Sequence, residues 1–464
     1  MIPNSSADLA SQDQRHHLHS QTNAVRHLDT DPLVIVAGDG PYVMDDHGRR
    51  YLDGVASLWC ASLGFSDARL AEAGARALRT LPVYHTFNHR SNPWAAELSA
   101  RVAALAPFPD ARVFFTSGGS EANDSMVKMA WYYQVARGRP ERRKIITRHG
   151  GFHGSTVMGA RLSGLPSMHR SFNLPDCDVV YAARPHFYRD GRPGETEAAF
   201  VARLAAELEA LILAEGPETI AAFLAEPMMG AGGVIVAPDG YFPAIAEVLR
   251  RHDILLLSDE IICGFGRTGR WFGCEGLGYT PDMMTIAKGL SAGYAPIGGV
   301  VVAPHVFAAI AAESDRNGVF AHGFTYSGHP VSAAIAIEAL AIYAEMDLPA
   351  VAARHGAHLA AALGARIAPH PLVGDVRTLG FLAGIELMAD GPGRVPFPAE
   401  LGVGARVERR ARAHGLIVRN LGDIIAVCPP YIVTPAEIDL LVDRLAAALD
   451  EVAAELAEGA ALSG

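Results

Sequence analysis

Residues 254–269 read ILLLSDEIICGFGRTG, an apolar run that ends in two acids and is followed by three glycines. Gly264, Gly266 and Gly269 form a G-x-G-x-x-G pattern. In dinucleotide-binding proteins this pattern opens a helix, and an acid about 20 residues later binds the ribose. Here RWFGCEGLGYTPD follows, whose glycines, aromatics and proline make a poor helix, and the acids Asp259 and Glu260 precede the glycines. The stretch predicts a buried strand with functional acids at its end, and a nicotinamide-dependent dehydrogenase is the weaker alternative.

The central part of the chain repeats this pattern. Apolar runs that end in Gly, Pro or a charged residue occur at 112–119, 144–148, 219–227 and 283–289. Segments of helical composition, such as 121–136 and 195–215, lie between them. Strands that alternate with helices predict an α/β fold with a mainly parallel sheet, whose ligands bind at the carboxyl ends of the strands.

The two ends of the chain have a different pattern. Residues 34–53 predict a small antiparallel meander, and long Ala-rich segments beyond residue 335 are followed by short strands near 380–387 and 424–427. We therefore expect a large domain over 76–335 and a smaller α+β domain formed by both termini, 1–75 and 336–464. Segment 327–343 is predicted to begin the helix that joins them.

Composition excludes several classes of function. The net charge of −11 disfavours a nucleic-acid surface, which needs clustered Lys and Arg. The uncharged stretch 289–312 is long enough to cross a bilayer, but Pro296, Pro304 and several glycines interrupt it, so a buried core segment is expected. Five scattered cysteines and a polar N-terminus without an apolar signal segment predict reduced thiols and a cytoplasmic protein. Cys263 is a candidate nucleophile, but no activating base is adjacent in sequence.

Three polar residues end separate predicted strands. Asp259 is placed to face a positively charged ring nitrogen, and Lys288, among apolar residues and Gly, is placed to act as an amine nucleophile. Ser120 follows two glycines at the start of a helix, where an anion is stabilised. Each has a simpler alternative: Lys288 could be a surface lysine and Ser120 an ordinary helix cap. Together they are typical of pyridoxal phosphate (PLP) enzymes, in which Lys forms the Schiff base and Asp holds the pyridinium nitrogen.

The sequence resembles the class III aminotransferases, which are fold-type-I PLP transferases, and among them the amine–pyruvate (ω-)transaminases. The motifs that carry the resemblance follow one another along the central region: SGGSEAND, HGGFHGST, AEPMMGAGGV, SDEIICGFGRTG, TIAKGLSAGYAPIGG and HGFTYSGHP. GRRYLDGVASLWC and LIVRNLGDIIAVCPP extend the match toward both ends.

The resemblance implies roles for the cofactor site. Lys288 would form the Schiff base and move a proton, and Asp259 would hold the ring nitrogen. Gly119 and Ser120 would bind the phosphate, with Thr325 of a second subunit, so that the enzyme would be a dimer with shared sites or a dimer of dimers. The remaining contacts implied around the ring are Glu226 beside Asp259, Ile261 and Phe152 on opposite faces, and His153 at the border.

Two positions depart from the family pattern. Phe152 stands where Tyr is common, so stacking is kept and a hydroxyl is lost. The phosphate loop is Ser117-Gly118-Gly119-Ser120, with one side-chain donor fewer than usual. No metal site is predicted.

The resemblance also implies the substrate pocket. Trp59 and Phe87 match aromatic walls, and Arg419 matches a mobile arginine that pairs with a substrate carboxylate. Asn88 would make one side more polar. The function implied is a ping-pong transamination from a primary amine or ω-amino acid to pyruvate, giving alanine, with an (S) preference. Decarboxylation or racemisation of an amino acid on the same scaffold is the alternative.

Overall fold

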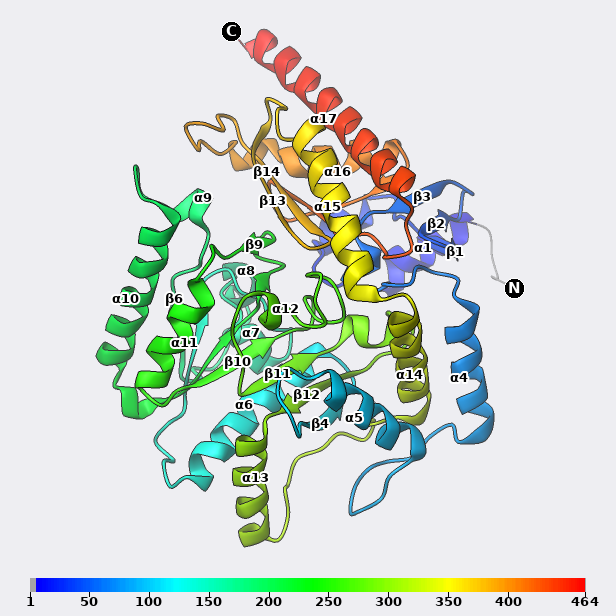
Figure 1. Ribbon diagram of the computed structural model, residues 1–464. Helices are drawn as coiled ribbons and strands as arrows, with labels where there is room; N and C mark the ends of the chain where they lie inside the picture. Colours follow the sequence, from blue (N-terminus) through cyan, green and yellow to red (C-terminus); the bar gives the residue numbers. More distant parts are fainter. Residues whose placement is uncertain (1–5, 464) are drawn as a thin grey trace.

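The computed structural model describes residues 6–463 and is built around a seven-stranded sheet (Figure 1). Residues 1–5 and 464, which belong to the expected terminal parts, lie outside the described residues. The strand order is β4-β12-β11-β10-β7-β5-β6. The strands are β4 (Arg112–Thr116), β5 (Lys144–Arg148), β6 (Val179–Ala182), β7 (Ile220–Ala225), β10 (Leu255–Asp259), β11 (Met283–Ile286) and β12 (Gly298–Val302). The five central strands predicted from sequence are confirmed as β4, β5, β7, β10 and β11.

The sheet is parallel except for β12, which pairs antiparallel with both β11 and β4. β12 lies in the uncharged stretch 289–312 and is buried throughout, so the predicted core segment is confirmed for β12, whereas Pro304, His305 and Phe307 later in the stretch are exposed. Among the described helices, none has both the length and the apolar composition needed to cross a membrane. The antiparallel insertion of β12 still leaves β4 parallel to β11, so their carboxyl ends share one edge of the sheet.

Helices cover both faces of this sheet. Neighbouring residues along a strand enter different cores: Leu257 packs into one and Leu256 into the other. On the first face lie α6 (Gly119–Ala136), α7 (Val157–Leu162) and α13 (Pro304–Asn317); on the second lie α10 (Glu197–Glu215), α11 (Tyr241–Arg251) and α14 (Pro330–Glu345). Burial on both faces explains why the strands are continuous apolar runs.

Smaller elements connect these layers. They are α8 (Pro166–His169), α9 (Phe187–Asp190), η1 (Pro217–Thr219), β8 (Met228–Met229), β9 (Ile235–Val236), α12 (Gly273–Gly276) and η2 (Lys288–Ser291). The segment after the glycine motif forms no long helix and contains the four-residue α12, in agreement with the poor helix predicted from its sequence. Gly266 and Gly269 have φ of +97° and +81° and shape a turn that buries Arg267, whose Nη1 donates to the carbonyl of Pro429 at 2.6 Å. The motif is therefore a structural turn.

The two ends of the chain meet in one sheet. The predicted meander is confirmed as β1 (Ile35–Asp39), β2 (Tyr42–Asp45) and β3 (Arg50–Asp53), and β3 pairs in parallel with β15 (Leu416–Ile417). The other N-terminal elements are α1 (Ser6–His16), α2 (Ala24–Leu28), the kinked α3 (Ala56–Trp59), α4 (Ala68–Thr80) and α5 (Pro93–Leu105).

The C-terminal part begins after α14, the connecting helix predicted from segment 327–343. It consists of α15 (Leu348–Arg366), β13 (Val373–Leu379), β14 (Leu382–Leu387), η3 (Ala399–Leu401), α16 (Val403–Ala413), β16 (Arg419–Asn420), β17 (Ile424–Val427) and α17 (Pro435–Ser463). Strands β13, β14, β17 and β16 form a four-stranded antiparallel sheet. In Figure 1 these elements lie above the large sheet, beside the N-terminal strands.

Candidate active site

A cavity of about 340 Å³ lies at the carboxyl edge of the large sheet. The ends of β4, β7, β10 and β11 deliver its polar lining because parallel strands present their carboxyl ends at one edge. The predicted residues that line it are Gly119, Ser120, Phe152, His153, Glu226, Asp259, Ile261 and Lys288. The structure thus brings together eight residues that are spread over 170 positions of sequence, from 119 to 288.

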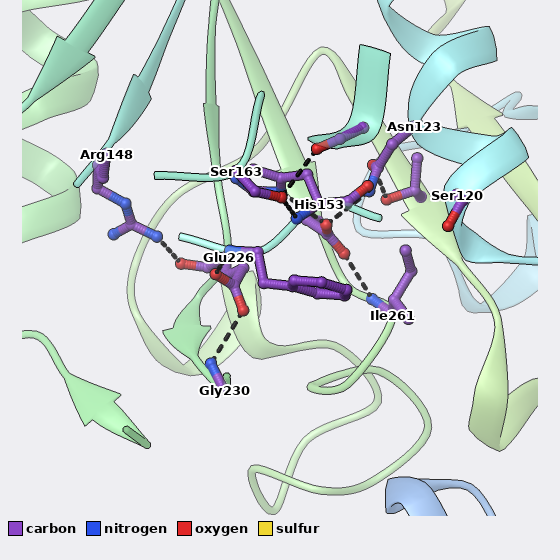
Figure 2. Close-up of polar contacts among 12 residues, drawn as sticks. Ser120, Asn123, Arg148, His153, Ser163, Glu226, Gly230 and Ile261 are labelled. Atoms are coloured by element: carbon purple, nitrogen blue, oxygen red, sulfur yellow. Dashed lines mark hydrogen bonds and ion pairs between the residues drawn. The ribbon is translucent and has the colours of Figure 1, made fainter. Parts of the chain in front are cut away.

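Asp259 is the most tightly held side chain of this cavity. Its Oδ2 accepts hydrogen bonds from Nδ2 of Asn123 and Nδ1 of His153, both at 2.8 Å, and its Oδ1 accepts from the N–H of Ile261 at 3.2 Å. Asn123 is itself fixed, since it also donates to the carbonyl of His153 and accepts from the hydroxyl of Thr285. Figure 2 labels Asn123, His153 and Ile261, whose polar atoms make these contacts. Together the contacts fix the orientation of the Asp259 carboxylate in the cavity lining.

Glu226 holds the loop that carries Phe152. Its carboxylate accepts from the N–H of Phe152 at 3.0 Å and from the N–H of Gly230 at 2.9 Å, while Nη2 of Arg148 donates to its carbonyl (Figure 2). Burial raises the pKa of Glu226, and the nearby Asp259 raises it further. Glu226 thus both lines the cavity and fixes the backbone on which Phe152 is mounted.

Lys288 lies two residues after the end of β11, partly buried in the wall of this cavity. Burial lowers the pKa of its ammonium group, against the opposing effect of Asp259. Its backbone lies in the left-handed region, with φ of +42°, which is unfavourable for a residue with a Cβ and is found at functional sites. The surface-lysine alternative is wrong, and the lowered pKa favours the neutral amine that a nucleophile or base requires.

The loop before α6 forms an anion cradle. The N–H groups of Gly119 and Ser120 lie in the first turn of α6, where the helix supplies no acceptor. Ser120 does not cap its own helix: Gly118 occupies the cap position, and the Ser120 hydroxyl accepts from the N–H of Ser155 at 3.1 Å. A Cβ at Gly119 would lie 2.7 Å from Cδ1 of Ile261, so a larger residue here would displace the Ile261 side chain. The alternative of Ser120 as an ordinary cap is therefore wrong.

These features fit PLP. Phe152 and Ile261 both line the cavity and supply apolar faces for a flat ring, and Asp259 is an oriented acceptor for a ring N–H. Gly119 and Ser120 form a cradle for a phosphate, and Lys288 provides a buried amine for an aldehyde. Each chemical group of the cofactor has a matching residue in one cavity.

Trp59 links the cofactor site to Arg419. Nζ of Lys288 lies 6.0 Å from the centre of a Trp59 ring, and Cζ of Arg419 lies 5.5 Å from it. Trp59 is buried in a core cluster next to the cavity, and neither it nor Arg419 lines the cavity itself. Among the described residues, the Arg419 guanidinium has no hydrogen bond or ion pair and lies near the indole. An unpaired guanidinium above an aromatic wall can pair with a carboxylate that enters the site.

Phe87 and Thr325 lie outside the cavity around Lys288. Phe87 is 42% exposed and lines a separate hollow with Asn88 and residues 319–323, and Thr325 is also exposed. Neither residue lines the cavity around Lys288. Their placement is compatible with a contribution to the site of a second subunit.

Several residues of the site were not predicted. Asn123, Thr285 and Ser163 hold Asp259 and His153, and Cys60 lines the cavity near Gly293. Asn123 lies one helical turn after Ser120, a spacing that places both on one face of α6 and could have identified it. Cys263 is buried, and burial raises the pKa of its thiol, which disfavours the nucleophile considered from sequence.

Comparison with known proteins gives a consistent picture. A family model described as aminotransferase class-III matches residues 23–449. Gamma aminobutyrate transaminase 3, chloroplastic, of Solanum lycopersicum is 47% identical over 424 residues, which cover 91% of this chain and 81% of the relative. The crystal structure of an omega transaminase from Pseudomonas jessenii in complex with PMP is 47% identical, with a TM-score of 0.94 over 96% of this chain and 98% of that chain. A structure described as a transaminase with L-ala is 47% identical, with a TM-score of 0.89 over 91% of this chain and 100% of that one.

Proposed function

Since this chain belongs to the class III aminotransferases, which use PLP, we propose that it moves the amino group of a primary amine or an ω-amino acid to pyruvate, giving alanine. The observation that carries this proposal is that Nζ of Lys288 and Cζ of Arg419 both lie within 6.0 Å of the centre of a Trp59 ring. An aromatic wall suits the apolar part of an amine, and an unpaired guanidinium suits the carboxylate of a keto acid or an ω-amino acid. The amine donor and the keto acid can then occupy the same pocket one after the other.

Different residues of the site would have different roles in this reaction. When bound, PLP supplies an electron sink that stabilises negative charge on the substrate carbon beside the nitrogen. Asp259, oriented by Asn123 and His153, would accept a hydrogen bond from the ring N–H of the cofactor. Lys288, whose pKa is lowered by burial, would take a proton from the substrate carbon at its Nζ and hold it for return. Phe152 and Ile261 would cover the ring and exclude water from it.

The relatives support two kinds of amino donor. A gamma aminobutyrate transaminase supports an ω-amino acid, and the omega transaminases support a primary amine. The transaminase with L-ala supports alanine as the product made from pyruvate. We expect (S)-amines to be preferred over their enantiomers.

The first test is the visible spectrum of the purified holoenzyme. We expect absorption from bound PLP that is lost on adding (S)-1-phenylethylamine or 4-aminobutyrate and restored by pyruvate, with the (R)-amine much slower. Restoration by 2-oxoglutarate alone would contradict the choice of pyruvate. Turnover of an amino acid without any keto acid would instead favour decarboxylation or racemisation.

Arg419 gives a sharper test of the carboxylate role. We expect Arg419→Leu to lower kcat/KM for pyruvate by roughly 10- to 150-fold, the range that a lost charged hydrogen bond of about 1.5–3 kcal/mol supplies. The half-reaction with 1-phenylethylamine, which has no carboxylate, should keep its rate. Arg419→Lys keeps the positive charge but lacks the planar guanidinium, and it is the matched control. We expect its kcat/KM for pyruvate to lie between that of the parent and that of Arg419→Leu. Equal losses for amine and pyruvate would exclude this role.

We further propose that the active enzyme is a homodimer in which Thr325 of each chain completes the phosphate site of the other. This accounts for the exposure of Thr325 and Phe87 outside their own cavity.

A further inference from the structure

Three imidazoles converge on one carboxylate near the N-terminus. Oδ1 of Asp13 lies 3.1 Å from Nδ1 of His17, and Oδ2 lies 2.8 Å from Nε2 of His19 and 3.1 Å from Nε2 of His27. Asp13 is on α1, His27 is on α2, and His17 and His19 are in the turn between them. We call these four residues the Asp13 cluster. It is distinct from the cavity around Lys288, whose lining contains none of them.

The separations in this cluster are close to those of a metal site. Zinc–ligand bonds of about 2.0–2.1 Å in a tetrahedron place neighbouring ligand atoms about 3.3 Å apart. The nitrogen–oxygen distances of 2.8–3.1 Å therefore need to open by only a few tenths of an ångström to admit an ion. The ligand atoms of Asp13, His17 and His19 already lie within 4.8 Å of one another. His27 lies outside this group of three and approaches only the Asp13 carboxylate, so its side chain has to move further than the other three to become a ligand.

The charges in the cluster also favour a cation. The ring centres are 4.3 Å apart for His17 and His19 and 4.0 Å apart for His19 and His27. Three imidazolium charges at these distances would repel one another, whereas a metal ion binds neutral rings and one carboxylate.

The surrounding backbone holds the ligands while leaving an entrance. Nε2 of Gln14 donates to the carbonyl of Thr30 at 2.9 Å and ties α1 to the end of α2, and Asn23 caps α2 with its side chain. The His27 side chain is 10% exposed, whereas that of His17 is 65% exposed. One side of the cluster is therefore fixed and the other is open to an ion from solution.

We propose that Asp13, His17, His19 and His27 form a binding site for a divalent transition-metal ion, with zinc as the reference ion. Three imidazoles and one carboxylate suit zinc, nickel and copper, and they do not suit magnesium or calcium, which take oxygen ligands. The bound ion joins α1 to α2 and lies outside the catalytic machinery.

Zinc binding to the holoenzyme tests the proposal. After treatment with a chelator, equilibrium dialysis against micromolar zinc with metal analysis should give one zinc per chain bound at this site. The double variant His17→Gln/His19→Gln should lose it, with affinity weaker by at least roughly 100-fold, since even outer-shell changes weaken metal sites by about 10- to 100-fold. His16→Gln changes the adjacent histidine, which is outside the cluster, and should bind zinc as the parent does. Transamination should be unchanged in both variants.

A second measurement requires no variant. Cobalt(II) added in place of zinc should give the intense visible bands of tetrahedral coordination without the sulfur charge-transfer band that cysteine ligation produces, and Asp13→Asn should weaken them. The proposal is overturned if the parent binds no zinc, if the double variant retains it, or if cobalt reports six-coordinate or thiolate ligation.

Discussion

Asn123 shows how one uncharged side chain can orient a buried carboxylate, here that of Asp259. It donates to Oδ2 of Asp259 and to the carbonyl of His153, and it accepts from Thr285. Asn123→Ala takes one hydrogen bond from Asp259, which keeps those of His153 and Ile261, and it removes the Asn123 partner of the His153 carbonyl and the Thr285 hydroxyl, at about 1–3 kcal/mol for each group left unpaired. We expect kcat/KM to fall by about tenfold or more, together with the melting temperature. Kinetics and thermal denaturation of the holoenzyme measure both effects.

Thr285→Val is the matched control, because it removes only the hydrogen bond to Asn123. It should lower kcat/KM less than Asn123→Ala does. Equal kcat/KM for Asn123→Ala and the parent enzyme would show that Asp259 does not depend on this contact.

For single residues, the sequence predicted the site residues at the ends of strands, but it missed the residues that hold their side chains in place. Lys288, Asp259 and Ser120 are recognisable because the parallel pattern places strand ends at one edge. Asn123 and Thr285 lie inside a helix and a strand, where only the packing of α6 on β10 and β11 reveals their partners. The roles of Trp59 and Arg419 came from resemblance, since nothing in their local sequence predicts their contact.

The loop after β5 depends on glycine at position 154. Gly154 has φ of +125°, and a Cβ there would lie 2.6 Å from Oγ of Ser120 and 2.9 Å from its Cα. Gly154→Ala should therefore displace the phosphate cradle as well as strain the backbone, with the strain alone at about 1–3 kcal/mol. We expect lower stability and at least a tenfold larger dissociation constant for PLP, measured by denaturation and by cofactor titration.

Gly194→Ala separates the two effects. Gly194 also has a positive φ, of +76°, but a Cβ there would meet no atom within 4 Å. It should lose stability through the backbone alone and bind PLP as the parent does. If the two variants bind PLP equally well, Gly154 does not support the cradle.

A buried ion cluster ties α9 to β13 and β14. Glu386 lies on β14, and its carboxylate is 2.5 Å from Nη2 of Arg189 and 2.6 Å from Nη1 of Arg377, near His186. Burial acts to raise the pKa of Glu386, but these partners outweigh it and lower that pKa from 4.5 to about 2. The lowered pKa corresponds to roughly 3 kcal/mol of stability that is present above pH 4.5 and lost as the pH falls toward 2.

We therefore expect Glu386→Gln to be less stable than the parent at pH 7, and the difference to shrink as the pH approaches 3. Urea denaturation at several pH values measures this difference. Glu207→Gln, which breaks a partly exposed i,i+4 pair with Arg203, should change stability by less than about 0.5 kcal/mol. A pH-independent difference for Glu386→Gln would exclude the ionic origin.

Among the elements, the strands were easier to predict than their directions. Continuous apolar runs identified β7, β10 and β11, but β12 was expected only as a core segment. Its antiparallel pairing depends on the turn at residues 289–297, which has no periodic pattern. Helix α14 spans the expected domain boundary at 335/336, so the boundaries at 75/76 and 335/336 stay predictions.

For the whole molecule, the proposed sharing of active sites can be tested by mixing defects. Lys288→Ala removes the amine, and Thr325→Glu places a negative charge against the phosphate of the partner's site. Each variant should be inactive alone. In a mixed dimer with shared sites, one active site would contain both Lys288→Ala and Thr325→Glu, and the other would contain neither substitution. Co-expression of the two variants should therefore restore activity. Measured activity and PLP content of purified mixed dimers decide the question.

Pairing Lys288→Ala with Asp259→Ala is the control, because both residues line the cavity of their own chain. Those mixed dimers should remain inactive. No recovery with Thr325→Glu would mean that each chain has a self-contained site.

The way Trp59 is held has a consequence for substrate range. Its backbone is left-handed, with φ of +63°, and a Cβ on Gly230 would lie 2.3 Å from its ring. Gly230 leaves the indole little room to move on that side. If the chain takes amines as proposed, we expect Trp59 to act as a rigid partition that limits their bulk, and Trp59→Ala to accept larger amines than the parent.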